Sequence, residues 1–264
     1  MFLGRKKKVR KMISEKTGKT LLLAFDHAFE HGPAKYEKVD LDPVRIAKIA
    51  LEGFADGVIV HAGAAKMIRK LIPKEMALIV KVTGKTSLSE EEIQSIVTTV
   101  KEAKKIGADG VAATLYVGSP YEHIMLEHFA KIKQDCLKYK MPLVGFAYPR
   151  VKGKKKNDTD AVMYAARVCA ELGCDLVKTY YTGSKESFKK VVDSCFAPLA
   201  CSGGEAISEA EFLKKAQDIM DAGANGMVVG RNVWMSEQPG LMLAKLHDIV
   251  YRRGAYEANH RNKL

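Results

Sequence analysis

The chain has 264 residues, of which 47% are hydrophobic and 28% charged, and its formal net charge is +12. This composition is typical of a globular protein, and the length fits one (β/α)8 barrel. No apolar run approaches the roughly 18 residues that span a bilayer, and no apolar stretch typical of a secretory signal follows the first charged residues. These features exclude a membrane-spanning chain and predict a cytoplasmic protein.

The five cysteines include no CxxC pair, so we expect reduced, buried thiols. The excess of basic residues predicts an anionic partner, either nucleic acid or a phosphorylated metabolite. Basic residues cluster at Arg5–Lys11 and at Lys152–Lys156. A nucleic-acid binder would interleave exposed aromatic residues with its basic face. The aromatic residues here mostly lie in apolar or strand-end positions, which favours the metabolite.

Eight short apolar runs recur along the chain, each bounded by Gly, Pro, Asp or Asn. Such runs are typical of parallel strands that are buried on both faces. In chain order they are Leu21–Phe25, Gly57–His61, Ala77–Val82, Gly110–Leu115, Pro142–Ala147, Leu176–Tyr180, Pro198–Cys201 and Gly226–Gly230.

Helical patterns separate these runs, and two of them open on a capping box. The first box pairs Ser89 with Glu92, and the second pairs Ser208 with Glu211. Apolar residues then recur at helical spacing. They are Ile93, Ile96, Val97, Val100 and Ala103 after the first box, and Leu213, Ala216, Ile219 and Met220 after the second.

A repeated junction precedes the second, fourth, sixth and eighth runs. Its four copies begin at Gly53, Gly107, Gly173 and Gly223, and each leads within three residues to Asp or Asn. We expect each glycine to end a helix in the left-handed conformation. Eight strands that alternate with helices allow a closed barrel or an open doubly wound sheet. Even spacing and the lack of GxGxxG at the first turn predict a single barrel domain over 1–264, with a basic N-terminal segment at about 1–19.

The active site of such a barrel lies at the carboxyl ends of its strands. Lys178 stands there inside an apolar strand, where burial lowers the pKa of an amine and makes it a nucleophile for carbonyls. The alternative is a lysine that reaches the barrel mouth or pairs with an acid. Lys81 shows the same pattern on the third strand, and for it we favour the structural alternative.

Two glycine-rich strand ends predict a phosphate site. Ser202, Gly203 and Gly204 follow the seventh strand, and Gly230 and Arg231 follow the eighth. Loops after these strands are the usual phosphate cradle of the fold, because glycines let backbone amides approach the oxygens and arginine adds charge. Simple tight turns are the alternative.

The first strand ends in a cluster that contains Asp26, His27, Glu30 and His31. The histidine spacing suits metal ligation from one helical face. The following Gly32 and Pro33 argue against a helix, so we favour a loop that binds sugar hydroxyls, with no metal. Tyr148 ends the strand beside that of Lys178. It is either a proton relay or a packing residue.

Together these segments resemble the archaeal-type class I fructose-bisphosphate aldolases, within the wider barrel aldolases that include deoxyribose-phosphate aldolase. The resemblance runs from Leu21 to about Asn232. The segments that carry it are Phe25-Asp26-His27, Glu30-His31-Gly32-Pro33, Gly84-Lys85-Thr86, Tyr148-Pro149-Arg150, Leu176-Val177-Lys178-Thr179, Ser202-Gly203-Gly204 and Val229-Gly230-Arg231-Asn232.

The resemblance implies roles for individual residues. Lys178 corresponds to the Schiff-base lysine, Tyr148 to the acid/base tyrosine and Asp26 to the strand-1 aspartate. The phosphate site falls on Ser202, Gly203, Gly204, Gly230 and Arg231, and His27, His31 and Arg150 complete the expected substrate contacts. The implied reaction is the reversible cleavage of fructose 1,6-bisphosphate without a metal or other cofactor, in a homo-oligomer such as a decamer.

Two positions depart from the family pattern, and both lie in substrate loops. The family usually has glycine after Asp-His, where this chain has Ala28, and it often has glycine soon after Tyr-Pro-Arg, where this chain has Val151-Lys152-Gly153. The resemblance therefore specifies the chemistry more closely than the sugar phosphate. A sister group that makes 2-amino-3,7-dideoxy-D-threo-hept-6-ulosonate is therefore the alternative, and the run Glu30–Pro33 favours the fructose-bisphosphate group. A phosphate-binding isomerase without covalent chemistry is a further alternative, because it would not need Lys178.

Overall fold

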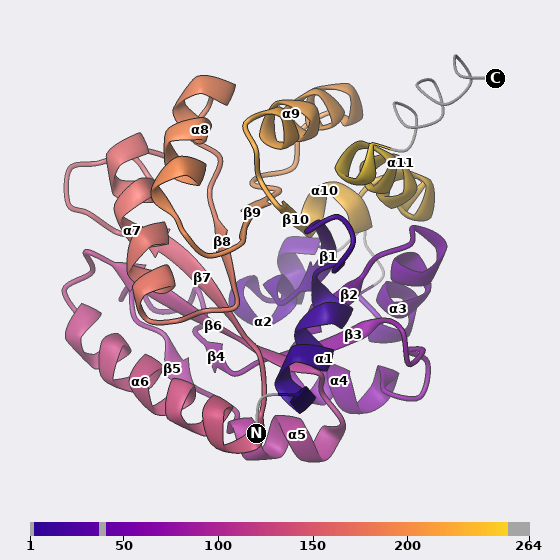
Figure 1. Cartoon of the computed structure of the whole chain (residues 1–264), viewed down its shortest axis with the longest axis horizontal. Coiled ribbons are helices and arrows are strands. Elements are labelled where there is room, and N and C mark those ends of the chain that lie inside the picture. Colours follow the sequence, from indigo (N-terminus) through magenta and orange to yellow (C-terminus); the bar gives the residue numbers. More distant parts are fainter. Residues whose placement is uncertain (1–2, 37–40, 253–264) are drawn as a thin grey trace.

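Eight parallel strands close into a barrel in the computed structural model, which describes residues 3–36 and 41–252 (Figure 1). The strands follow the order β1-β10-β9-β8-β7-β6-β3-β2 around the barrel. Their bounds are β1 (Thr20–Phe25), β2 (Gly57–Val60), β3 (Ala77–Lys81), β6 (Gly110–Val117), β7 (Leu143–Pro149), β8 (Leu176–Thr179), β9 (Leu199–Ser202) and β10 (Gly226–Val229). Each predicted apolar run overlaps one of these strands, so the predicted (β/α)8 barrel is confirmed.

Helices surround this ring of strands (Figure 1). They are α1 (Leu3–Met12), α2 (His27–His31), α3 (Pro43–Glu52), α4 (Ala62–Ile68), α5 (Val100–Ile106), α6 (Glu122–Tyr139), α7 (Thr159–Glu171), α8 (Lys185–Ser194), α9 (Glu209–Asp221), α10 (Arg231–Trp234) and α11 (Pro239–Tyr251), with a 3-10 turn η1 (Pro33–Tyr36). None of these described helices is long and apolar enough to cross a membrane. All five cysteines are buried and free, as predicted.

The apolar core has two parts, because a strand presents alternate residues to opposite faces. One part packs the outer faces of the strands against the helices. The other fills the barrel interior, where Leu22, Ile59, Val144 and Phe146 meet. Met12, at the end of α1, joins this interior core and closes the bottom of the barrel. The interior is therefore solid below its mouth.

The repeated junction fastens neighbouring strands at the bottom of the barrel. In each copy the side chain of the Asp or Asn accepts a hydrogen bond from a backbone amide of the barrel strand that precedes the junction in the chain, which is β1, β3, β7 or β9. The pairs are Asp56 with Leu21 (2.6 Å), Asp109 with Leu78 (3.2 Å), Asp175 with Leu143 (2.8 Å) and Asn225 with Leu199 (2.9 Å). Because a buried amide without a partner is costly, each junction fixes the register between two strands.

One of the four glycines does not adopt the predicted conformation. Gly107, Gly173 and Gly223 have the expected positive φ, but Gly53 has a φ of −96°. The junction at Gly53 is one residue longer, and Phe54 takes the positive φ of 58° instead. Gly53 is required for close packing, because a Cβ there would lie 2.3 Å from the Cβ of Leu243 on α11.

The first predicted capping box is wrong, and the second is right. Ser208 and Glu211 exchange both hydrogen bonds of a box at the start of α9. The segment after Ser89 instead runs across the barrel mouth between two short antiparallel strands, β4 (Thr83–Gly84) and β5 (Ser95–Ile96). The helix α5 begins only after Thr99, whose side chain accepts from the amide of Glu102. We call the segment 83–96 the flap.

The basic N-terminal cluster is held against the barrel bottom by the same acidic junctions. Arg5 pairs with Asp175 at 2.6 Å, and Lys11 pairs with Asp109 at 2.7 Å. Lys8 points its ammonium at the carbonyl of Ala108. These charges neutralise acids of the barrel itself, so they contribute little to any anionic partner.

Candidate active site

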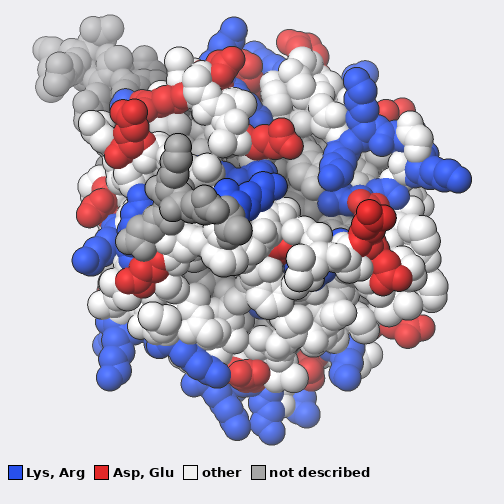
Figure 2. Space-filling model, turned by 180° about the vertical axis from the view of Figure 1, so that it is seen from behind, with Lys and Arg blue, Asp and Glu red and all other residues white. Residues whose placement is uncertain are grey.

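A cavity of about 700 Å³ opens at the carboxyl ends of the strands. The face of the molecule opposite to that of Figure 1 is hollowed, with Lys and Arg side chains at the rim of the hollow (Figure 2). All eleven residues that the sequence predicted for the site line this cavity. They are Asp26, His27, His31, Tyr148, Arg150, Lys178, Ser202, Gly203, Gly204, Gly230 and Arg231.

Lys178 lies on β8 with only 4% of its surface exposed. Its Nζ lies 4.0 Å from the centre of the Phe146 ring, which β7 places directly opposite in register. Burial lowers the pKa of Lys178 to about 8, with a contribution from the charge of Lys81, while Asp26 and Glu30 oppose the shift. The cavity therefore holds an amine that is partly neutral near physiological pH.

Tyr148 lies two residues beyond Phe146 on β7, so both rings face the barrel axis. The ring of Tyr148 stacks on that of Tyr180 with 4.3 Å between the centroids. Burial raises the pKa of Tyr148 well above its ordinary value, and the neighbouring Tyr180 adds to this. The phenol therefore keeps its proton and can donate it into the cavity that Lys178 also lines.

Lys81 is completely buried and joins two carboxylates at the barrel mouth. Its Nζ lies 3.1 Å from Oδ2 of Asp26 and 3.6 Å from Oε1 of Glu30. The prediction that Lys81 pairs with an acid is thus confirmed. The ammonium also lies 4.7 Å from the centre of the Phe146 ring, beside Lys178, so the lysine belongs to the site.

The two carboxylates on Lys81 have pKa shifts of opposite direction. Burial alone would raise the pKa of Asp26, but Lys81, His27 and Lys178 outweigh it and hold that pKa well below its usual range. Burial raises the pKa of Glu30 despite the attraction of Lys81, and the charge of Asp26 adds to the rise. Asp26 is thus a permanent carboxylate, and Glu30 is the stronger base of the two.

His27 and His31 lie on a one-turn helix, α2, and not in the predicted loop. The backbone of Gly32, at φ 74°, ends the turn, so the Gly-Pro pair permits one helical turn before it. The Nδ1 atom of His27 lies 3.3 Å from Oδ1 of Asp26, and burial lowers the pKa of His27 to about 3. The two imidazole rings are 6.0 Å apart.

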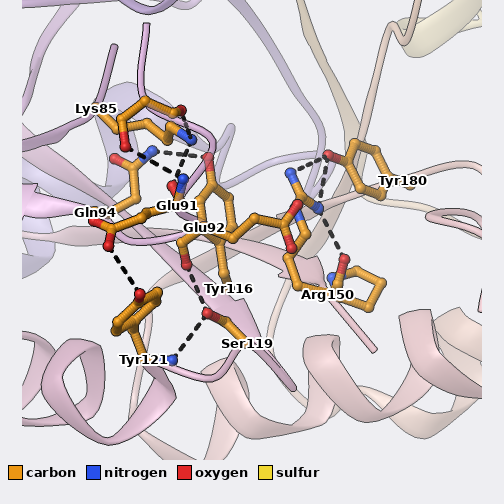
Figure 3. A network of polar contacts seen from close by, with 11 residues as sticks. Lys85, Glu91, Glu92, Gln94, Tyr116, Ser119, Tyr121, Arg150 and Tyr180 are labelled. Carbon is orange, nitrogen blue, oxygen red and sulfur yellow. Dashed lines mark hydrogen bonds and ion pairs between the residues drawn. The ribbon is translucent and has the colours of Figure 1, made fainter. Parts of the chain in front are cut away.

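Arg150 connects the barrel to the flap (Figure 3). Its Nε lies 2.8 Å from a carboxylate oxygen of Glu92, and its guanidinium lies over the ring of Tyr116 at 4.3 Å. Two of its nitrogens lie 3.4 Å from the hydroxyl oxygen of Tyr180. The flap residue Gln94 donates to the Tyr116 hydroxyl at 2.9 Å. The flap therefore forms one wall of the cavity.

The predicted phosphate residues meet around one turn. Arg231 donates to the carbonyl of Gly204 at 3.1 Å, and Gly204 has a φ of 79°. A Cβ on Gly230 would lie 3.1 Å from the carbonyl oxygen of Ala24, a tight contact that favours glycine there. Both Oγ of Ser202 and Nε of Arg231 are buried without a partner, which is typical of a site that binds a ligand.

Among the residues around the cavity that were not predicted for the site, Phe146, Tyr180, Glu30 and Lys81 lie near Lys178 or Arg150. Phe146 lies among apolar strand residues, and Tyr180 follows β8; neither carries a sequence signal beyond that of a packing residue. Glu30 and Lys81 were noted in the sequence, Glu30 in the cluster after the first strand and Lys81 inside the third, but neither was assigned to the site. No group of three or more His, Cys, Asp or Glu residues able to hold a metal occurs in residues 3–36 and 41–252.

Comparison with known proteins agrees with this geometry. The sequence of residues 20–236 matches the DeoC/LacD family of aldolases. The class 1 fructose-bisphosphate aldolase of Thermoproteus tenax is 39% identical over 90% of this chain and 92% of its own. That of Halobacterium salinarum is 35% identical over 91% and 93%. The 2-amino-3,7-dideoxy-D-threo-hept-6-ulosonate synthase 1 of Archaeoglobus fulgidus is 36% identical over 95% and 92%.

Solved structures give the same grouping. An archaeal fructose 1,6-bisphosphate aldolase is 36% identical, covers 94% of this chain and 99% of its own, and superposes with a TM-score of 0.87. An archaeal fructose-1,6-bisphosphate aldolase with its catalytic lysine bound to a carbinolamine intermediate matches with the same identity, coverage and TM-score. The family match covers most of the barrel that builds the cavity. This chain therefore belongs to the DeoC/LacD family of aldolases.

Proposed function

We propose that this chain is a class I aldolase that reversibly cleaves fructose 1,6-bisphosphate into dihydroxyacetone phosphate and glyceraldehyde 3-phosphate. The observation that carries the proposal is Lys178, a buried amine at the cavity floor whose pKa is lowered to about 8. The two class 1 fructose-bisphosphate aldolases at 35% and 39% identity support the substrate.

The first step is attack of the neutral Lys178 amine on the ketone carbon of the sugar. Loss of water from the resulting carbinolamine gives a protonated imine, which withdraws electrons from the neighbouring carbon. Asp26 accepts hydrogen bonds from sugar hydroxyls in this step, because Lys81 keeps it ionised.

Cleavage follows when the C4 hydroxyl gives its proton to a carboxylate of the Asp26–Glu30 pair and the C3–C4 electron pair moves into the imine. Glyceraldehyde 3-phosphate leaves, and an enamine stays on Lys178. Tyr148 donates its proton to C3 and regains one from the carboxylate that took the C4 proton, so the proton lost from the hydroxyl and the proton gained by carbon balance. Water then hydrolyses the imine, which releases dihydroxyacetone phosphate and restores the amine.

The charge of the cavity suits a substrate with two phosphates. Seven lysine or arginine side chains line it, against four carboxylates. The cations are Lys35, Lys85, Arg150, Lys156, Lys178, Lys215 and Arg231. They lie on both sides of Lys178: Lys215 and Arg231 contact the β9–α9 turn, and Arg150 contacts the flap. Two anionic ends would therefore each find cations.

Synthesis of 2-amino-3,7-dideoxy-D-threo-hept-6-ulosonate is the second candidate, because a relative with that name is 36% identical. Both candidates use a Schiff base, so the products decide between them. Incubation with fructose 1,6-bisphosphate and enzymatic detection of both triose phosphates tests the proposal. Triose phosphates should appear with multiple turnover, and their absence would favour the second candidate.

The proposal includes a cytoplasmic, homo-oligomeric enzyme that acts on a small phosphorylated sugar and binds neither nucleic acid nor membranes. The family resemblance suggests a decamer or similar assembly, and light scattering after gel filtration measures its mass. The single domain over 1–264 also stays a prediction, and limited proteolysis tests it.

A further inference from the structure

Lys215 reaches the phosphate turn from the middle of α9. Its Nζ donates to the carbonyl of Gly203 at 3.0 Å, and a Cβ on Gly204 would lie 3.0 Å from the same nitrogen. The ammonium also lies 5.6 Å from the centre of the Tyr181 ring. Lys215 therefore lines the cavity beside the phosphate turn. Arg231 donates to the following carbonyl of the same turn, that of Gly204.

The turn does not need Lys215 to hold its shape. The side chain of Asn232 already donates to the carbonyl of Gly203 at 3.2 Å and to that of Glu205 at 2.8 Å. Its oxygen accepts from the amide of Ile207 at 2.9 Å. A buried asparagine thus fixes both ends of the turn, and the charge of Lys215 is additional.

Neither cation beside the turn has an acidic partner. No ion pair joins Lys215 or Arg231 to a carboxylate in the part of the chain that the structure describes. Burial lowers the pKa of Lys215, which shows that the ammonium is partly removed from water. A charge in such a place is costly unless an opposite charge compensates it. In the same cavity lining, Oγ of Ser202 and Nε of Arg231 are buried without a hydrogen-bond partner.

We propose that Lys215 binds the substrate phosphate at the β9–α9 turn, opposite Arg231, so that two cations share one dianion. The inference rests on the proposed function in that the phosphate belongs to a sugar substrate. A phosphate there would supply the missing opposite charge and accept from Ser202 and Arg231. The sequence alone gives no sign of this role, because Lys215 is one of two adjacent lysines on an amphipathic helix that lies outside the barrel.

The test compares Lys215→Met with Lys214→Met, which removes the adjacent, exposed lysine of the same helix. Each variant and the parent are assayed for imine trapping by borohydride with dihydroxyacetone phosphate and with unphosphorylated dihydroxyacetone. We expect Lys215→Met to lower the preference for the phosphorylated ketone about 10- to 100-fold, as for loss of one charge-assisted hydrogen bond. Lys214→Met should match the parent, and Lys215→Arg should recover most of the preference.

Two results would overturn the assignment. One is an unchanged preference in Lys215→Met, and the other is an equal loss with both ketones, which would indicate general damage to the site. The rise in melting temperature on addition of inorganic phosphate gives an independent readout. This rise should be smaller in Lys215→Met than in the parent and unchanged in Lys214→Met. If the parent traps no ketone at all, the aldolase proposal fails, while the phosphate melts still decide on Lys215.

Discussion

The pH of the medium should control imine formation through Lys178. Its pKa of about 8 lies below that of an ordinary lysine, so the reactive neutral amine gains population as pH rises through that value. About one tenth of the amine is neutral at pH 7, against roughly one in 2,500 for a lysine with a pKa of about 10.4. Burial and the neighbouring Lys81 thus raise the reactive fraction on the order of 250-fold.

The assay is the initial rate of imine formation with dihydroxyacetone, followed by borohydride quench between pH 6 and pH 10. Dihydroxyacetone carries no phosphate, so the titration belongs to the protein. We expect the rate to rise about tenfold from pH 6 to pH 7 and to level off above about pH 9. A rate that still rises tenfold between pH 9 and pH 10 would refute the lowered pKa.

Replacement of Lys81 by Met separates the two causes of the shift. The variant loses the cation that lowers the pKa of Lys178 and keeps the carboxylates of Asp26 and Glu30 that raise it. The plateau should therefore move to higher pH. An unchanged profile would mean that burial alone sets the pKa. The other ionisable groups that interact with Lys178, namely His27 and Cys201, are present in both proteins.

Three further predictions concern individual side chains. Arg231→Ala removes a charge-assisted contact of about 1.5–3 kcal/mol, so kcat/KM for fructose 1,6-bisphosphate should fall roughly 10- to 150-fold. An unchanged kcat/KM would mean that the phosphate site does not lie at Arg231. Tyr148→Phe should lower turnover about 100- to 10,000-fold while borohydride still labels the protein, and normal turnover would reduce Tyr148 to a packing residue. Lys81→Met leaves buried carboxylates without their cation, so the free energy of unfolding measured in urea should fall by about 3–5 kcal/mol. A fall below about 1 kcal/mol, typical of surface pairs, would contradict the buried ion pair.

The barrel could be predicted from sequence because its strands are short apolar runs between glycine and acidic junctions. The junctions at Asp56, Asp109, Asp175 and Asn225 were recognised as turns, but their hydrogen bonds to neighbouring strands depend on three-dimensional register. The part of the flap after Ser89 was predicted as the start of a helix because its apolar spacing fits one. The contacts of Gln94 and Glu92 with Tyr116 and Arg150, distant in sequence, override that local preference.

The site could be predicted where a residue type conflicts with its surroundings. Lys178 inside an apolar strand is such a conflict, and glycines at two strand ends are another. Lys215 offers no conflict, since a lysine on an outer helix is ordinary until the fold places it at the phosphate turn. The pairing of Lys81 with both Asp26 and Glu30 likewise depends on two strands and a helix meeting at the mouth.

The central claim is that Lys178 is the nucleophile. The most direct measurement is borohydride reduction in the presence of dihydroxyacetone phosphate, followed by proteolysis and mass mapping of the modified peptide. The account predicts one substrate adduct on Lys178 and its loss in Lys178→Arg, which keeps the charge but forms no imine. An adduct on Lys81, or no adduct on any lysine, would contradict it.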